Sequence, residues 1–496
     1  MVTPTELREL IAAYPEWLLI RDTGRSFPLF AGEIDITTDD GRTLVGFMDD
    51  GGFHSWRLND FKFSEGAIEL DLAGPFAQKR ETVRLVPRES AAALAASVEL
   101  ARLEKANEVA RMIESSIAAT KIIRIDLNIE NGRLGQIIFE RDRIRTAALA
   151  DVTSGLTPES ILTAAMTWLE KLAVRSKHPI ADVLIAAESR QAKALQKLHA
   201  LLNERWKAKI SVAEVSRRAD TAVIRELPKR KIRELWREKT KQLTIPRDPQ
   251  PSETASRLIE LAPDEIDIVY SKQGETLRFL GLPFARVRSL LGKEKAWFGV
   301  NKVRRVLTPE NWNEAVELVR DLVKYRTPKS ENTRHEYYRT APEAWLESIL
   351  RRDIRRLDAN LILSPIYNQF RTSNDKIDLL ALRRDGRLVV IELKTQPDRE
   401  MIFQAADYWR KIELQRRRGV LSAADLFDGR EILDEPVLVY LAAPALSFHR
   451  DYEFFARSLA SDIELWRFEL HENWREKIKV LARREFHDQT FGLTNL

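Results

Sequence analysis

The chain has 496 residues, 44% of them hydrophobic and 31% charged, with 19 glycines and 20 prolines. This composition excludes a disordered or collagen-like chain, and the length predicts several domains. The absence of cysteine excludes disulfides, thiolate zinc sites and cysteine nucleophiles, and the formal net charge of +5 permits nucleic-acid binding without requiring it.

Two features of the sequence bear on location. It contains no run of about 18 uncharged apolar residues, so we expect no membrane-spanning helix. The first residues, Met1 to Arg8, lack the basic and apolar blocks of a signal peptide. Together with the lack of cysteine, these features predict a cytoplasmic protein.

Residues 1–88 have the pattern of a β-rich N-terminal domain. After a helix at 6–14, apolar and polar residues alternate from 18 to 85 between turn signals such as Asp49-Asp50-Gly51-Gly52. Short strands at roughly ten-residue spacing predict a small barrel or sandwich.

Residues 89–243 form a predicted middle region with α/β and helical segments. The stretch 90–118 predicts a long helix, because it is rich in alanine and its apolar residues have helical spacing. The basic run 217–241 also predicts a helix, with Lys229-Arg230-Lys231 at its centre. The other strands and helices expected in this region lie at 122–129, 134–139, 158–174, 180–188, 191–202 and 207–215.

The second half of the chain begins after a proline-rich stretch at 244–252, which predicts a linker. A small α/β segment is expected at 256–328. The last predicted domain, 340–496, alternates helix, strands, helix, strand, helix and strand. Overall the sequence predicts a mixed α/β protein of several domains.

The most informative stretch is a predicted β-hairpin that carries Asp378 on its first strand and Glu392 and Lys394 on its second. A two-residue turn would place the two carboxylates on opposite faces, because side chains alternate along a strand. A three-residue loop, 384–386 with Gly386 left-handed, would set Asp378 opposite Glu392 with Lys394 on the same face. A β-bulge would give the same result, so a functional site requires one of these two local structures.

Two carboxylates and an ammonium on buried strands are costly unless they hold a metal or perform chemistry. Metal-assisted hydrolysis of a phosphodiester needs this set. Two carboxylates bind a hard divalent cation, which stabilises charge on the phosphate and lowers the pKa of the attacking water. A lysine can orient or deprotonate that water, or pair with the phosphate.

These residues resemble the PD-(D/E)xK, or restriction-endonuclease-like, nuclease superfamily over about residues 342–480. The resemblance implies an α-β-β-β-α-β core, with Asp378 as the acid of the second strand and Glu392 and Lys394 as the Glu-x-Lys of the third. It implies Mg²⁺ or Mn²⁺ bound by Asp378, Glu392 and the backbone carbonyl of Leu393. Ile377 stands where the strict motif has proline.

Two further matches extend the resemblance. The helix opening at Pro342 is placed where members supply another acid, and Glu347 is the residue expected to serve as an outer metal ligand. Gln404 and Tyr408 are similar to the Gln-x-x-x-Tyr motif of RecB-type nucleases, which implies that they orient the lysine or contact substrate. With Lys411 they share one helix face.

Two weaker patterns remain open. Asp126 and Glu140 repeat the spacing of Asp378 and Glu392, with Asp142 in place of the lysine, which suggests an inert, degenerate copy or an unrelated α/β segment. Basic residues beside aromatic ones could form a nucleic-acid surface or an ordinary solvated one. They are Arg286, Arg288, Lys302, Arg304 and Arg305, near Trp297 and Phe298.

The sequence therefore predicts a metal-dependent nuclease that acts on nucleic acid, with DNA as the expected substrate and a homodimer as one possible state. No P-loop, His-Glu-x-x-His or Gly-x-Ser-x-Gly motif offers another enzyme class. A catalytically inactive nuclease-fold protein that binds nucleic acid or acts as a scaffold is the alternative, and RNA as the substrate is not excluded.

Overall fold

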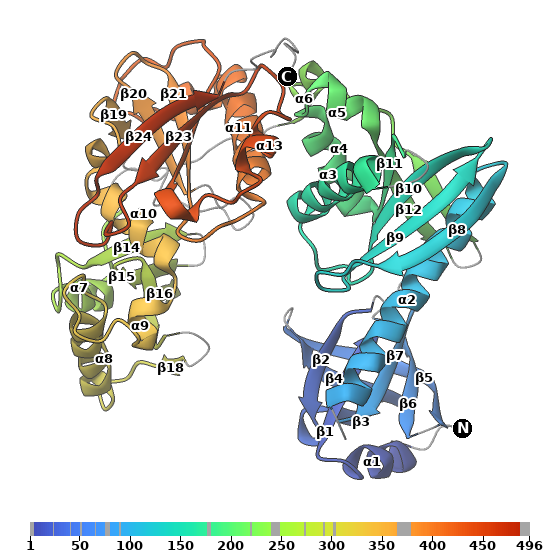
Figure 1. Ribbon diagram of the computed structural model, residues 1–496. Helices are drawn as coiled ribbons and strands as arrows, with labels where there is room; N and C mark the ends of the chain where they lie inside the picture. The colour runs from blue at the N-terminus through green and yellow to red at the C-terminus, as the bar shows by residue number, and fades with distance from the viewer. Residues whose placement is uncertain are drawn as a thin grey trace. The chain divides into compact units, whose positions relative to one another are not determined.

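The structure is a computed structural model with helices and sheets throughout (Figure 1), so the predicted mixed α/β fold class is confirmed. The chain divides into two compact units, residues 1–199 with 207–229 and residues 200–206 with 230–496. The residues described are 4–22, 24–39, 41–49, 52–64, 66–74, 80–88, 91–175, 180–218, 221–239, 249–271, 274–290, 293–300, 304–364 and 378–486.

The first unit begins with helix α1 (Pro4–Ala12) and a seven-stranded antiparallel sheet of order β2-β1-β7-β6-β5-β4-β3. Leu7 and Ile11 of α1 are buried against the sheet, whose inward residues alternate with exposed ones. The β-rich N-terminal region is thus present. Its strands are β1 (Glu16–Arg21), β2 (Ser26–Phe30), β3 (Asp35–Asp39), β4 (Arg42–Asp49), β5 (Gly52–Ser64), β6 (Ala67–Ala73) and β7 (Arg80–Pro87), with a short 3-10 turn at Ala31–Glu33.

The predicted long helix is α2 (Ala91–Ser116), which leads into a six-stranded sheet of order β13-β12-β11-β10-β9-β8 and packs against β8, β9 and β13. Strand β10 was not predicted, because its alanines carry little strand signal. The elements after α2 are β8 (Thr120–Leu127), β9 (Leu134–Arg141), β10 (Ile144–Asp151), α3 (Pro158–Arg175), β11 (Val183–Glu188), α4 (Ser189–Ala200), α5 (Glu204–Lys209), β12 (Ile210–Arg218) and β13 (Thr221–Glu226).

The predicted basic helix at 217–241 is wrong. The chain forms strand β13 there, then a loop containing Lys229, then the short helix α6 (Ile232–Leu235). Pro228 explains part of the error, because a proline inside a helix removes a backbone hydrogen bond and clashes with the preceding turn. Most of the predicted linker at 244–252 lies outside the described residues.

The second unit contains a five-stranded antiparallel sheet of order β14-β15-β16-β17-β18, flanked by helices. Strand β16 was not predicted. The elements are α7 (Glu253–Ile259), β14 (Ile266–Ser271), β15 (Gly274–Phe279), β16 (Leu282–Leu290), β17 (Lys293–Phe298), β18 (Arg305–Val306), α8 (Trp312–Tyr325) and α9 (Glu336–Arg339).

The same unit contains a six-stranded sheet of order β19-β20-β21-β22-β23-β24, in which β21, β22 and β23 are parallel and the other pairs antiparallel. The first elements follow the predicted order α-β-β-β-α-β. The elements are α10 (Pro342–Arg352), η3 (Ile354–Arg356), β19 (Leu361–Leu363), β20 (Leu379–Arg383), β21 (Leu388–Leu393), α11 (Met401–Arg417), α12 (Val420–Ala423), β22 (Leu438–Pro444), η4 (Ala445–Ser447), α13 (Tyr452–Ala456), β23 (Glu464–Leu470) and β24 (Val480–Phe486).

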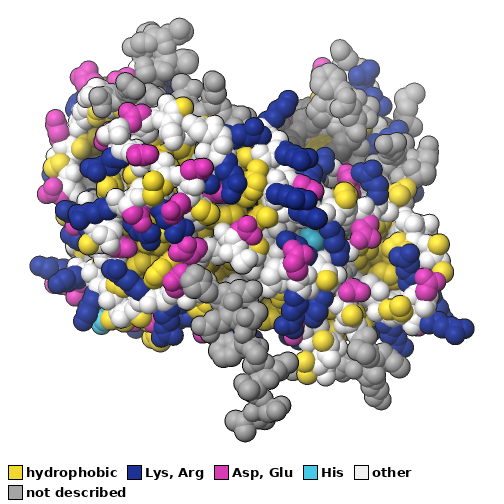
Figure 2. Space-filling model, turned by 90° about the horizontal axis from the view of Figure 1, so that it is seen from above, with side chains coloured by type: hydrophobic (Ala, Val, Ile, Leu, Met, Phe, Trp, Pro, Cys, Tyr) yellow, Lys and Arg dark blue, Asp and Glu magenta, His cyan; other side chains and the backbone are white. Residues whose placement is uncertain are grey.

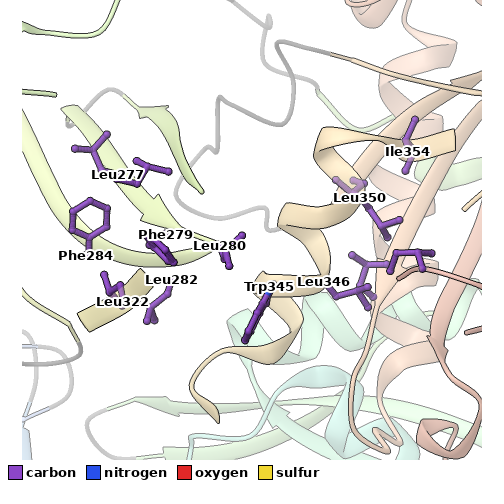
Figure 3. Close-up of a cluster of buried hydrophobic side chains, with 14 of the residues drawn as sticks. Leu277, Phe279, Leu280, Leu282, Phe284, Leu322, Trp345, Leu346, Leu350 and Ile354 are labelled. Atoms are coloured by element: carbon purple, nitrogen blue, oxygen red, sulfur yellow. The ribbon is translucent and has the colours of Figure 1, made fainter. Parts of the chain in front are cut away.

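One hydrophobic core joins these two sheets. Side chains of the five-stranded part, such as Phe279 and Leu322, lie in the same cluster as Trp345 and Leu350 of α10 (Figure 3). The cluster continues to Ile391 on β21. The predicted segments 256–328 and 340–496 therefore share a core, and α10 is held between the two sheets.

The second and fourth sheets have the same topology. In each, three antiparallel strands are followed by two parallel strands and an antiparallel edge strand. By this order β9 and β10 correspond to β20 and β21, whereas Asp126 lies on β8 and Glu140 on β9. The predicted match of these two acids to Asp378 and Glu392 is therefore wrong by one strand.

The surface is charged but mixed. Figure 2 shows lysine and arginine side chains interspersed with acidic ones over the visible face, as expected from a small net charge. Among the helices of the described ranges, none has the length and apolar content to cross a membrane.

Candidate active site

The hairpin β20–β21 has the register that a site requires. Leu379 pairs with Ile391 and Leu382 with Leu388. The Arg383 N–H donates to the Arg387 carbonyl (2.8 Å), which closes a three-residue loop, and Gly386 in that loop has φ +92°. The predicted odd-length loop is confirmed, and Asp378 continues the ladder opposite Glu392.

Asp378 and Glu392 lie together at the end of the hairpin. One Asp378 oxygen accepts the N–H of Leu393 (2.9 Å), which ties the acid to the neighbouring strand. Glu392 is only 3% exposed, and its Oε2 has no hydrogen-bond partner in the described part of the chain. Burial and then the charge of Asp378 raise the pKa of Glu392 well above its usual value, although Lys394 opposes this.

Lys394 is the cation of this cluster. Its Nζ lies 3.2 Å from Glu392 Oε1 and 2.9 Å from Asp398 Oδ2. Burial alone lowers the pKa of Lys394, but the carboxylates of Glu392 and Asp398 outweigh burial and raise it. Lys394 is therefore protonated in this arrangement, and its ammonium group is fixed by the two carboxylates. Asp398 was not predicted as a site residue, because it lies in the loop between β21 and α11, whose path no local sequence pattern reveals.

Helix α10 offers two acids, and the structure separates them. Glu347 is buried and forms an ion pair with Arg278 (3.4 Å), which also binds Asp267. Glu343, one turn earlier on the same helix face, is close enough for its charge to raise the pKa of both Glu392 and Lys394. The role predicted for Glu347 stays a prediction, and Glu343 is a second acid of α10 whose charge acts on the site.

The predicted pair Gln404 and Tyr408 lies on α11, the helix that packs against β21 and β22 (Figure 1). Both side chains are partly exposed. Lys411, on the same face, pairs with Asp407 (3.1 Å) and lies 5.5 Å from the centroid of the Tyr408 ring. The roles given to Gln404 and Tyr408 stay predictions.

The donor set fits a hard cation in one respect. Glu392 Oε2 is a buried acceptor without a partner, next to a second carboxylate, and a cation would satisfy both. In the described ranges, however, no three or more acidic or histidine side chains gather as a ready-made metal site. A cation here would need further ligands from water, substrate or a backbone carbonyl such as that of Leu393.

Comparisons with known proteins give one weak structural likeness and no sequence match. No protein-family model matches the chain, and no curated protein matches it. Among solved structures, the chain is similar to a repair endonuclease from Pyrococcus abyssi at 14% identity, over 40% of this chain and 92% of that chain, with a TM-score of 0.14. A likeness of that degree transfers neither residues nor activity to this chain.

Proposed function

We propose that this protein is a metal-dependent nuclease that hydrolyses phosphodiester bonds in DNA. The observation that supports it most is the position of Asp378 near Glu392, one step beyond the Leu379–Ile391 pair of the hairpin, with Lys394 ion-paired to Glu392. Burying two like charges together costs free energy, which suggests that function keeps them there. Perturbed carboxyl pKa values are also typical of active sites.

In this proposal Asp378 and Glu392 hold Mg²⁺ or Mn²⁺, with the Leu393 carbonyl as a third oxygen donor and Glu343 or Glu347 as an outer carboxylate. The bound ion supplies Lewis-acid stabilisation of the phosphate and a water of lowered pKa. Lys394 keeps its ammonium and contacts the phosphate or the attacking water. Gln404 and Tyr408 orient Lys394 or contact the substrate from α11.

A second candidate is a protein of this fold that binds nucleic acid without cleaving it. It is favoured by the lack of a preformed group of three metal-binding side chains within the described residues. It is also favoured by the position of Lys394, which already neutralises one oxygen of Glu392.

The two candidates are separated by cleavage of matched single-stranded, double-stranded and branched DNA, and of RNA, with Mg²⁺, Mn²⁺ or EDTA. We expect metal-dependent cleavage of DNA by the wild type and none by Asp378→Ala. Calorimetric titration with Mn²⁺ gives an independent readout, with binding weakened in the same variant. Absence of both cleavage and Mn²⁺ binding would favour the second candidate, and cleavage of RNA alone would change the substrate.

A further inference from the structure

A second feature of the 249–496 region is the outer face of β16 and β17. In the ladder Arg286 pairs with Trp297 and Arg288 pairs with Lys295. Directly opposed residues in an antiparallel pair share a face, as do residues two apart on one strand. These four side chains therefore project from one face, while Val287 between the arginines is buried on the other.

The charges on this face are crowded. Burial, followed by the nearby charges of Arg288 and Arg304, lowers the pKa of Arg286. The Arg288 guanidinium lies 5.9 Å and the Lys295 ammonium 5.4 Å from the centroid of the Trp297 ring. Like charges opposed across a sheet are destabilising, so an external anion bound here would stabilise this face.

Two neighbouring acids, Glu294 and Glu275, are engaged by backbone N–H groups. Glu294 accepts the N–H groups of Glu253 and Thr254, and Glu275 accepts the N–H of Ser252, so both carboxylates cap the start of α7. Within the part of the chain that the structure describes, no carboxylate forms an ion pair with Arg288, Lys295 or Arg304.

Two residues grouped with this surface in the sequence do not belong to it. Phe298 is 5% exposed and packs in the core, and Arg305 pairs with Glu314 (2.5 Å). Lys302 lies outside the described residues. What remains is a row of cations around one partly exposed tryptophan, which is the pattern of a surface that holds phosphates and stacks a base.

We propose that this face, formed by Arg286, Arg288, Lys295, Trp297 and Arg304, binds a single-stranded polynucleotide. Trp297 stacks on a base while the cations contact the adjacent phosphates. A single strand is favoured over a duplex because its bases can unstack and reach an aromatic ring on a sheet surface. The binding does not require the proposed cleavage, although it would place substrate on the same body as the candidate active site.

The test measures binding in the full chain carrying Asp378→Ala, in EDTA, so that cleavage plays no part. Fluorescence anisotropy follows a labelled 20-nucleotide strand of DNA, the same sequence as RNA, and the DNA duplex. We expect both single strands to bind more tightly than the duplex. A difference between the two single strands would identify the polymer that the face prefers.

Variants at Trp297, and a double variant at Arg288 and Lys295, then test the face itself. Trp297→Ala should weaken single-strand binding about tenfold, while Trp297→Phe retains most of it. Arg288→Ala with Lys295→Ala should reduce the slope of log affinity against log salt by about 1.4, since each phosphate contact on a single strand contributes ~0.7.

The matched control is Arg305→Ala with Arg320→Ala, which removes the same charge from the same segment at residues already paired with glutamates. It should leave binding within about twofold of the parent. Thermal melts identify any variant that has lost its fold. The proposal is overturned if the control weakens binding as much as the face variants, if Trp297→Ala binds normally, or if the duplex binds best.

Discussion

Glu392 is the residue on which the functional account depends most. Its carboxylate is buried, one oxygen has no partner, and the charges of Asp378 and Glu343 act against its ionisation. A buried charged acceptor without a partner costs ~1–3 kcal/mol, and removing that cost is what a bound cation would do. The site is therefore expected to be less stable without metal than with it.

The first prediction concerns pH. Because the folded-state pKa of Glu392 is raised, its contribution to stability is present below the unfolded value of 4.5 and is lost as pH rises through the folded value. Metal-free Glu392→Gln should therefore gain stability over the wild type with rising pH, by about 1–3 kcal/mol. Thermal melts in EDTA from pH 4 to 9 measure this, with the exposed Glu431→Gln as control. A difference that stays flat with pH would contradict it.

The second prediction separates the two acids of α10. Glu343→Gln should lower the cleavage rate and raise the Mg²⁺ concentration required, about tenfold, because its charge acts on the site. Glu347→Gln should cost about 2 kcal/mol of stability, since the buried Arg278 loses one carboxylate partner, and should leave the Mg²⁺ requirement unchanged. The opposite pattern would return Glu347 to the role predicted from sequence.

For single residues, the sequence predicts a shared site only where local spacing along the chain brings the residues together. Asp378, Glu392 and Lys394 lie on one hairpin, so strand alternation and loop length were enough to place them. Glu343 and Asp398 were missed, because their proximity depends on how α10 packs and how the loop after β21 runs. The ion pair between Glu347 and Arg278 was not predicted either, because Arg278 lies on β15, far from Glu347 in the sequence.

The hairpin β20–β21 is the element that makes the site. Its three-residue loop sets the register, and Gly386 adopts a positive φ there that a side chain would oppose. A Cβ at Gly386 would also approach the Leu433 side chain to 2.8 Å and the Glu431 carbonyl to 3.3 Å. Both conformation and space therefore require glycine.

The third prediction follows from that geometry. Gly386→Ala should cost more stability than Gly419→Ala, which also has a positive φ (+67°) but no atom near the added Cβ. We expect about 1–2 kcal/mol for the conformation at each position and at least ~1 kcal/mol more at Gly386. Chemical denaturation measures both. Equal losses would show that the contact with Leu433 is relieved without cost.

Among the elements, those with strong periodicity were predicted and those without it were not. Helices α2 and α3 match their predicted spans closely, because their apolar spacing is regular. Strand β10 is rich in alanine and β24 rich in charge, so neither carries a clear strand pattern. The basic run after Arg217 was predicted from composition alone, and charge does not distinguish strand from helix.

The whole molecule combines two sheets of one topology with two further sheets. The counterpart of the hairpin β20–β21 in the first unit is β9–β10, where Asp151 accepts the N–H groups of Thr153 (2.8 Å) and Leu156 (3.0 Å). Thr153 follows Asp151 at the spacing at which Lys394 follows Glu392. This sheet thus has a hydrogen-bonded carboxylate and no lysine at that position. That it is an inert copy, or an unrelated α/β segment, stays a prediction.

The fourth prediction concerns the shared core. A fragment 340–496 would expose Trp345 and Leu346, which are fully buried against residues such as Phe279. We expect this fragment to be unfolded or aggregated, whereas 230–496 retains both sheets and folds. Circular dichroism and limited proteolysis distinguish them. A cooperatively folded 340–496 fragment would show that the five-stranded sheet is dispensable.

The central claim is that the hairpin is a nuclease active site, and the most direct test is single-turnover cleavage of DNA with Mg²⁺ by the wild type, Lys394→Ala and Lys477→Ala. Lys477 is an exposed lysine of the same unit. The account predicts that Lys394→Ala lowers the rate at least about 100-fold at saturating substrate while Lys477→Ala cleaves normally. Equal cleavage by all three proteins would contradict it.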